Sequence, residues 1–337
     1  MIRKKRKAGF DGPSPEEYAE GVLEGNRVML SKAITLIESN APQHFDAAQS
    51  LIQKITPERK PSLRIGITGV PGAGKSTFID AFGSLLCDKG HKVAILAVDP
   101  SSQVSKGSIL GDKTRMERMA RNPRGFVRPS PSSGVLGGVN RKTRETILLC
   151  EAAGYDIILV ETVGVGQGEF MVRGMVDFFL LLVLTGAGDE LQTMKKGIME
   201  LPDLVVVNKA DGENVAQAKK AMQEYNTILH FLKPYTEGWT TEAVTASALK
   251  EQGISEIWGI IEKFKEITLG SGGFEERRME QQKDWFYESI KEQLMFRFFN
   301  SKGIKEKIRA FEEDLKKEKV AVAANVQSLL DEFFSKN

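Results

Sequence analysis

The sequence contains few of the residues that build disulfides or soft-metal sites. Its 337 residues include two cysteines and three histidines. Cys87 and Cys150 each lie in an apolar helical pattern, so buried reduced thiols and a reducing cytoplasm are expected rather than a disulfide. His44, His91 and His230 lack the spacing of metal ligands, which argues against a nickel-inserting metallochaperone.

Long apolar runs and a large net charge are also absent. The longest apolar run, FFLLLVL at 178–184, is far shorter than the roughly 20 residues of a membrane-spanning helix. The 47 Lys and Arg residues nearly balance the 45 Asp and Glu residues, so the net charge is +2. Neither nucleic acid nor a membrane is therefore an expected partner. The basic start, MIRKKRKAGF, is expected to be a solvated tail.

Between residues 62 and about 270, apolar runs alternate with helical patterns. The runs are SLRIGIT, KVAILAVD, GFVRP, YDIILVE, DFFLLLVL, DLVVVN and EAVTAS. Several are continuous Val, Ile and Leu segments, which is typical of strands buried on both faces. The sequence therefore predicts an α/β fold with a mostly parallel sheet flanked by helices.

Three regions are expected along the chain. Residues 1–60 form an N-terminal helical extension, residues 61–270 the α/β domain, and residues 271–337 a charged, helical C-terminal arm. The stretch GSGGFEER at 270–277 is predicted to be a hinge or linker. The arm carries long apolar stripes that need covering, either by the core or by a second copy in a dimer.

The glycine-rich segment after the first strand matches the phosphate-binding pattern GxxxxGK[ST], with a strand before it and a helix after it. Glycines let backbone N–H groups point at phosphate oxygens, and the helix N-terminus adds positive potential. Lys75 is predicted to reach the β- and γ-phosphates, and the Ser76 hydroxyl to bind Mg2+. The predicted phosphate-binding residues are Gly69, Val70, Pro71, Gly72, Ala73, Gly74, Lys75, Ser76 and Thr77.

A second motif, NKAD at the end of a buried strand, predicts guanine as the base. Asp211 accepts hydrogen bonds but cannot donate them, which matches the N1–H and amino group of guanine and opposes the bare N1 of adenine. Asn208 is expected to brace the base and the phosphate loop, and the stem of Lys209 to cover the purine. The later triplet Ser247, Ala248 and Leu249 is predicted to donate backbone N–H groups to the guanine carbonyl.

Acidic residues lie at loop positions between these two motifs. Asp99 ends AILAVD, Asp112 lies in GSILGDKTRM, and Glu161 ends IILVE. Carboxylates near a triphosphate hold Mg2+ directly or through water. Together with Ser76 they are the predicted metal ligands, with helix capping or a surface loop as the alternative for Asp112.

The motifs together resemble the MeaB/ArgK family of P-loop GTPases, which are similar to the human methylmalonic aciduria type A protein. The segments that carry the resemblance are GITGVPGAGKST, AVDPSS, GSILGDKTRM, RPSPSSGVLGG, LLCEAAGYDIILVETVGVGQ, GAGDELQ and KKGIMELPDLVVVNKAD. The resemblance runs closely from about residue 25 to 270.

The resemblance implies a GTPase that serves an adenosylcobalamin-dependent acyl-CoA mutase, usually methylmalonyl-CoA mutase. Such a chaperone gates the delivery of adenosylcobalamin from an adenosyltransferase and protects the mutase. Family members are commonly homodimers joined by the C-terminal arm, which fits the uncovered stripes. An extra switch segment matches residues 186–197, and its Lys195 is expected to approach Glu161 or the phosphates when the mutase is bound.

The stretch ETVGVGQ contains the remaining predicted switch residues. In small Ras-like GTPases the corresponding strand ends in Asp, with a Gly three residues later that senses the γ-phosphate. Here Glu161 and Gly164 have that spacing, and Gln167 is a candidate for positioning the attacking water. Hydrolysis by the protein alone is expected to be slow, with acceleration by the mutase.

Two other functions are compatible with parts of the pattern. One is an ATP-dependent kinase that regulates a lysine, arginine and ornithine transport system with a periplasmic binding protein. Asp211 argues against it, because a carboxylate favours guanine. The other is a structural dimeric scaffold without nucleotide dependence.

Overall fold

The computed structural model describes residues 12–99, 116–131, 136–162, 168–185, 196–315 and 321–336. The chain divides into two compact units, Met1–Gln281 and Gln282–Asn337, which are described separately. In the described part of the chain, no helix combines the length and apolar character that crossing a membrane requires.

The first unit is built on a seven-stranded sheet whose order is β3-β2-β4-β1-β5-β6-β7. All neighbouring strands are parallel, and each corresponds to one predicted apolar run, so the predicted α/β fold is confirmed. The strands are β1 (Leu63–Gly69), β2 (Val93–Asp99), β3 (Gly125–Pro131), β4 (Ile157–Thr162), β5 (Phe178–Val183), β6 (Leu204–Val207) and β7 (Glu242–Thr245).

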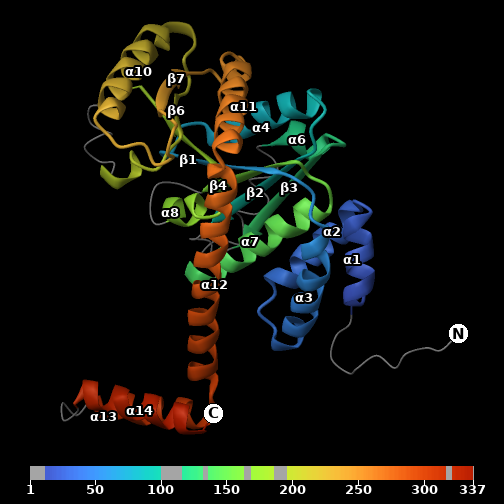
Figure 1. Cartoon of the computed structure of the whole chain (residues 1–337), viewed down its shortest axis with the longest axis vertical. Helices are drawn as coiled ribbons and strands as arrows, with labels where there is room; N and C mark the ends of the chain where they lie inside the picture. The colour runs from blue at the N-terminus through green and yellow to red at the C-terminus, as the bar shows by residue number, and fades with distance from the viewer. Residues whose placement is uncertain are drawn as a thin grey trace, which may run out of the picture. The chain divides into compact units, whose positions relative to one another are not determined.

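Helices cover both faces of this sheet (Figure 1). On one face, α4 and α11 pack against the sheet. Phe264 of α11 contacts Phe178 of β5 at 4.9 Å between ring centroids. On the other face, a Cβ at Gly66 would meet Val172 of α8 and Phe179 of β5. The helices are α4 (Lys75–Asp88), α6 (Glu117–Arg121), α7 (Leu136–Ala152), α8 (Gly168–Arg173), α10 (Val215–His230) and α11 (Ile254–Ser271).

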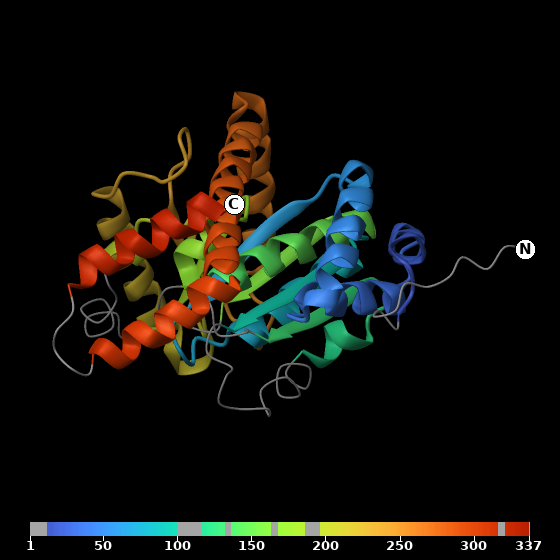
Figure 2. The ribbon, with the colours of Figure 1, turned by 90° about the horizontal axis from the view of Figure 1, so that it is seen from below.

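The helical N-terminal region is confirmed as three helices that pack beside α7 and β3 (Figures 1 and 2). Arg128 on β3 forms an ion pair with Glu38, and Lys142 Nζ on α7 donates to the Glu38 carbonyl at 2.6 Å. Ser14 begins the first helix with a capping box. The helices are α1 (Pro15–Leu23), α2 (Arg27–Glu38) and α3 (Pro42–Ile55).

Residues 270–277, predicted to be a hinge or linker, do not form a linker, because most of them are helical; the hinge stays a prediction. α11 continues to Ser271, and α12 (Gly273–Asn300) begins two residues later. Only Gly272 interrupts the two helices, with a φ of 78° that favours glycine. The glycines that indicated a loop therefore form a one-residue helix break.

The second unit contains the rest of α12 together with α13 (Lys302–Leu315) and α14 (Val322–Lys336). Phe298 packs on Phe333 at 5.3 Å between ring centroids, and Lys307 pairs with Glu332. Many of its large apolar side chains are exposed, although several of them lie outside the predicted stripes, and their coverage by a second copy stays a prediction. The most exposed are Phe286, Met295, Phe296, Val322 and Phe334.

Both cysteines have the predicted environment. Cys87 on α4 and Cys150 on α7 are buried and free. Burial raises the pKa of each thiol, so neither is activated as a thiolate at neutral pH.

Candidate functional site

The phosphate-binding pattern forms the turn that joins β1 to α4. Gly69 is the last residue of β1, and a Cβ there would lie 2.4 Å from the Leu182 carbonyl oxygen on β5. Gly74 has a φ of 83°, and a Cβ on it would lie 3.0 Å from Nδ2 of Asn208. Only glycine fits both positions, so the motif has the geometry of a phosphate-binding loop.

Lys75, the first residue of α4, extends its ammonium group into this loop. Its Nζ donates to the carbonyl oxygens of Gly69 at 2.9 Å and Val70 at 3.4 Å. Burial lowers the pKa of Lys75, while the nearby carboxylates of Glu161 and Glu169 act in the opposite direction. The ammonium is thus partly desolvated and can exchange its two carbonyl partners for phosphate oxygens.

Two of the predicted metal ligands lie close together. The Ser76 hydroxyl is 3.5 Å from Oε1 of Glu161, which is buried near the end of β4. Beside them, Thr162 donates to the hydroxyl of Thr68 at 2.7 Å and joins the ends of β4 and β1. A hydroxyl and a carboxylate are the hard oxygen donors that suit Mg2+. Within the described ranges no group of three or more His, Cys, Asp or Glu side chains could hold a metal ion.

Asn208, after β6, connects the phosphate loop to the later SAL segment. Its Nδ2 donates to the Ala73 carbonyl at 2.7 Å, and its Oδ1 accepts from the Ala248 amide at 3.1 Å. The side chain is 1% exposed. One amide group therefore braces two loops that are far apart in the sequence, one of them the phosphate loop, and its predicted contact with the base stays a prediction.

Asp211 lies beside the same segment. Ser247 donates its hydroxyl to Oδ2 of Asp211 and accepts from the Lys250 amide at 3.1 Å. Lys209 has a φ of 60°, and the Ala210 amide donates to the Ala246 carbonyl at 3.0 Å. The two segments thus form a hydrogen-bonded platform, at whose surface Leu249 is 74% exposed.

Comparison with known proteins decides the family. A family model described as "Methylmalonyl Co-A mutase-associated GTPase MeaB" matches residues 30–303. The chain belongs to the MeaB family of GTPases. Like its relatives it is a nucleotide-binding GTPase of the P-loop class.

Curated relatives and a solved structure agree with the family match. The chain is 48% identical over 283 residues to "GTPase ArgK" of Escherichia coli K12, covering 84% of this chain and 86% of that protein. It is 44% identical over 302 residues to the mouse "Methylmalonic aciduria type A homolog, mitochondrial", covering 87% and 73%. A crystal structure titled "LAO/AO transport system kinase" matches with a TM-score of 0.74 and 36% identity, covering 97% and 100%.

Several predicted residues of this MeaB-family site lie outside the described residues. These are Asp112, Gly164, Gln167 and Lys195. The backbone of Asp99 ends β2, next to β4, but its side chain is not described. The roles of these five residues stay predictions.

The sequence reasoning missed one buried carboxylate of the site. Glu169, in the first turn of α8, is 0% exposed, and its charge partly opposes the lowering of the Lys75 pKa by burial. The sequence does contain a sign of this residue. A helix that follows a strand of a parallel sheet begins at the carboxyl edge of the sheet, so an acidic residue in its first turn lies on the side of the phosphate loop.

Replacing Asn208 with alanine is expected to lower both stability and GTP affinity. The change leaves the Ala73 carbonyl and the Ala248 amide without their partner, which costs about 2–4 kcal/mol in the free energy of unfolding. Urea unfolding and equilibrium GTP binding measure the two effects.

Asn226→Ala is the matched control for this prediction. Asn226 exchanges the same pair of hydrogen bonds with Ala243, at 3.0 and 2.8 Å, away from the nucleotide loops. It should lose similar stability and keep its GTP affinity. An equal fall in GTP affinity in both variants would show that Asn208 has no specific bracing role.

Proposed function

We propose that this GTPase is a nucleotide-dependent chaperone of an adenosylcobalamin-dependent acyl-CoA mutase of the methylmalonyl-CoA mutase type. In this role it gates adenosylcobalamin delivery and protects the mutase. The observation that carries the proposal is the extent of the family match. It runs to residue 303, beyond the nucleotide domain and through the whole of α12. The match therefore includes the helical arm as well as the residues that bind nucleotide.

In the proposed mechanism, the phosphate loop and Lys75 hold the triphosphate. The loop amides and the Lys75 ammonium neutralise its charge, since phosphoryl transfer depends mainly on positioning and electrostatics. Ser76 and Glu161 would hold Mg2+, joined by Asp99 and Asp112. The ion would draw charge from the β- and γ-phosphates.

The other proposed roles concern the base and the switch. Asp211 accepts the two guanine N–H groups, and Lys209 covers the ring. The Gly164 amide contacts the γ-phosphate, Gln167 orients the attacking water, and Lys195 approaches Glu161 when the mutase binds. Residues 247–249 donate backbone N–H groups to the guanine carbonyl. In this structure the Ser247 amide donates to the Gln252 carbonyl at 2.9 Å and the Ala248 amide to Asn208, so these donors would have to change partners. The Ser76–Glu161 contact at 3.5 Å supports this scheme, because it joins the phosphate loop to the strand that leads into the switch.

The proposed partners follow from the same family membership. They are the mutase, an adenosyltransferase that supplies the cofactor, and a second copy of this chain joined through the C-terminal arm. The exposed apolar side chains of α12 and α14 support a homodimer, because such faces are costly in water. A cytoplasmic location suits the free thiols of Cys87 and Cys150.

Association of the purified protein with methylmalonyl-CoA mutase tests this function. The dissociation constant should differ by about five-fold or more between GDP and a non-hydrolysable GTP analogue, the usual range for coupled sites. Adding the mutase should also raise the rate of GTP hydrolysis. Equal affinity with both nucleotides, together with an unchanged hydrolysis rate, would refute the chaperone role.

Replacing Glu161 with alanine is expected to separate nucleotide binding from signalling. GDP affinity should stay within about three-fold of wild type, since Asp211 and the loop amides are intact, while the nucleotide dependence of mutase binding is lost. Calorimetry with GDP and mutase association with each nucleotide measure these effects. Glu213→Ala, at an exposed position, is the control and should change neither. Equal loss of GDP binding and of coupling in Glu161→Ala would instead indicate a structural role for Glu161.

A further inference from the structure

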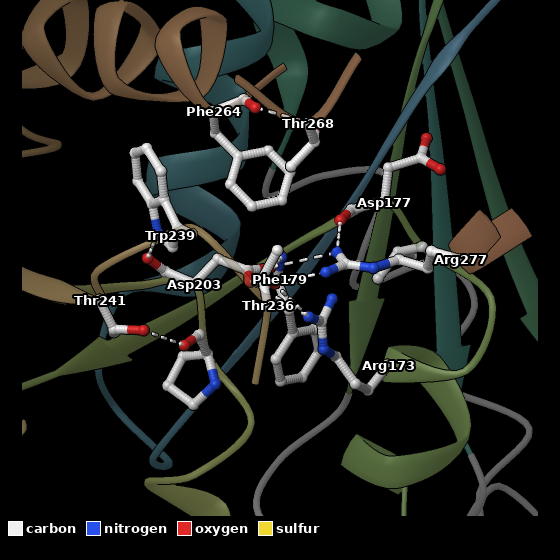
Figure 3. Close-up of polar contacts among 12 residues, drawn as sticks. Arg173, Asp177, Phe179, Asp203, Thr236, Trp239, Thr241, Phe264, Thr268 and Arg277 are labelled. Atoms are coloured by element: carbon white, nitrogen blue, oxygen red, sulfur yellow. Dashed lines mark hydrogen bonds and ion pairs between the residues drawn. The ribbon is translucent and has the colours of Figure 1, made fainter. Parts of the chain in front are cut away.

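A buried network of arginines and aspartates lies at the end of the sheet opposite the nucleotide loops (Figure 3). Asp177 and Asp203 directly precede β5 and β6, so they lie at the amino ends of parallel strands. Both carboxylates are almost completely buried. Buried charges require partners, and guanidinium groups provide them here.

Asp203 and Thr236 are shared by arginines from two different helices. Arg173, the last residue of α8, donates from Nη2 to Asp203 Oδ1 at 3.1 Å and to the Thr236 hydroxyl at 3.3 Å. Arg277 in α12 donates to the same Thr236 hydroxyl, and its Nη1 lies 3.9 Å from Asp203 Oδ2. The guanidinium groups of Arg173 and Arg277 converge on these shared acceptors in Figure 3. A displacement of either arginine must therefore alter the hydrogen bonds available to the other.

Helix α8 follows β4, whose Glu161 lies 3.5 Å from Ser76 of the nucleotide site, and it ends in this network. It spans six residues, Gly168–Arg173, or about 9 Å. Its first turn carries Glu169, whose buried charge acts on Lys75, and Arg173 ends it. Val172 packs it against β1 at Gly66. This short helix thus packs on β1, and its last residue, Arg173, reaches Asp203 at the amino end of β6.

Arg173 is incompletely satisfied in this arrangement. Its Nε and Nη1 are buried without a hydrogen-bond partner among the described residues. The guanidinium stacks over the ring of Tyr235, 4.2 Å from its centroid, and burial lowers its pKa while Asp203 opposes that shift. Unsatisfied buried donors are rare in stable structures. Arg173 therefore keeps donors to spare, and its hydrogen bonds to Asp203 and Thr236 do not use the full capacity of its guanidinium group.

Arg278, the neighbour of Arg277 on α12, has a different environment. Its Nε and Nη2 bind the two oxygens of Asp177 at 2.8 and 2.7 Å, and Nη2 also donates to the Ser62 carbonyl at 2.8 Å. This bidentate pair joins α12 to β1 and β5 without involving α8. Arg278 therefore anchors α12 without α8. Arg277 also donates to the Asp177 carbonyl, but it shares Thr236 and Asp203 with Arg173 of α8.

We propose that Arg173 is a positioning residue that couples the nucleotide site to the first turns of α12. When the nucleotide shifts α8, the hydrogen bonds of Arg173 to Asp203 and Thr236 change. The contacts by which Arg277 holds α12 to Asp203 and Thr236 then change as well. The coupling thus reaches the part of α12 that belongs to the first unit, residues 273–281. The proposal rests on the proposed function only in assuming that nucleotide state shifts α8.

Hydrogen exchange of the full-length protein tests the coupling. In wild type, the peptide covering 273–281 should exchange at rates that differ by about five-fold or more between GDP and a non-hydrolysable GTP analogue. Arg173→Met should abolish this difference while leaving the affinity for both nucleotides within about two-fold. Arg173→Lys keeps the charge beside Asp203 and should restore part of the difference.

Two further variants make the test specific. Thr236→Val removes the shared hydroxyl without changing side-chain size, so it should also reduce the difference if Arg173→Met fails to fold. Arg278→Met should raise exchange in both nucleotide states and leave their ratio unchanged. The coupling is refuted if Arg173→Met or Thr236→Val retains the wild-type ratio, or if nucleotide-bound wild type shows no difference at 273–281. A wild-type difference without nucleotide-dependent mutase binding would refute the chaperone role but support the coupling.

Discussion

Lys75→Ala is expected to lower kcat/KM for GTP hydrolysis by at least about a hundred-fold, the usual loss when a charge-stabilising donor is removed from a transition state. The ammonium lies within the phosphate loop, bonded to the carbonyls of Gly69 and Val70. It needs only a change of partners to reach phosphate oxygens. Alanine supplies no charge there and leaves the two carbonyls without this donor.

Phosphate release under saturating and limiting GTP measures the effect of Lys75→Ala, and thermal unfolding checks the fold. Lys89→Ala, at the exposed end of the same helix, is the matched control and should hydrolyse GTP normally. The variant also addresses the scaffold alternative, in which mutase binding would persist without nucleotide dependence. Hydrolysis within about three-fold of wild type would contradict the predicted role of Lys75.

Asp211→Asn is expected to weaken GTP binding by about a hundred-fold and to improve the binding of xanthosine triphosphate. A site that pairs with polar groups of its substrate discriminates strongly against mismatched ones. Asparagine would direct an N–H group at the guanine amine, whereas xanthine has a carbonyl oxygen there. The Ser247 hydroxyl can still donate to the remaining side-chain oxygen, so the platform is preserved.

Binding of GTP, ATP and xanthosine triphosphate to wild type and Asp211→Asn, measured side by side, tests this prediction. Glu213→Gln, two residues further on and exposed, should leave all three affinities unchanged. The same experiment addresses the kinase alternative suggested by the name of one solved relative. A wild-type protein that prefers ATP would overturn the guanine assignment and favour that alternative.

The sequence predicted the features that depend on neighbouring residues. Continuous apolar runs such as DFFLLLVL became the strands of the parallel sheet, because burial on both faces excludes polar side chains. The linker prediction at 270–277 failed because glycines are typical of loops and also of the single residue that ends a helix, and the sequence pattern does not distinguish the two. Only packing decided that Gly272 would be the single non-helical residue between α11 and α12.

The nucleotide motifs could also be predicted from the sequence, because the residues of each motif are neighbours in the chain. The phosphate loop needs its glycines and Lys75 within eight residues, since one turn must wrap a phosphate. The sequence also indicated that Asn208 braces this loop. Its actual partners, the Ala73 carbonyl and the Ala248 amide, became known only once the parallel strands brought their ends together.

By itself, then, the sequence determined the α/β class, the phosphate loop and the guanine motif, because each is set by the order of nearby residues. Tertiary structure alone decided that Arg173 and Arg277 share Asp203 and Thr236, although these residues are far apart in the chain. The residues next to a charged side chain in the sequence do not indicate which opposite charge will pair with it in the fold. The strand order sets β5 beside β6, and the burial of the charged groups at their amino ends requires these groups to pair with one another.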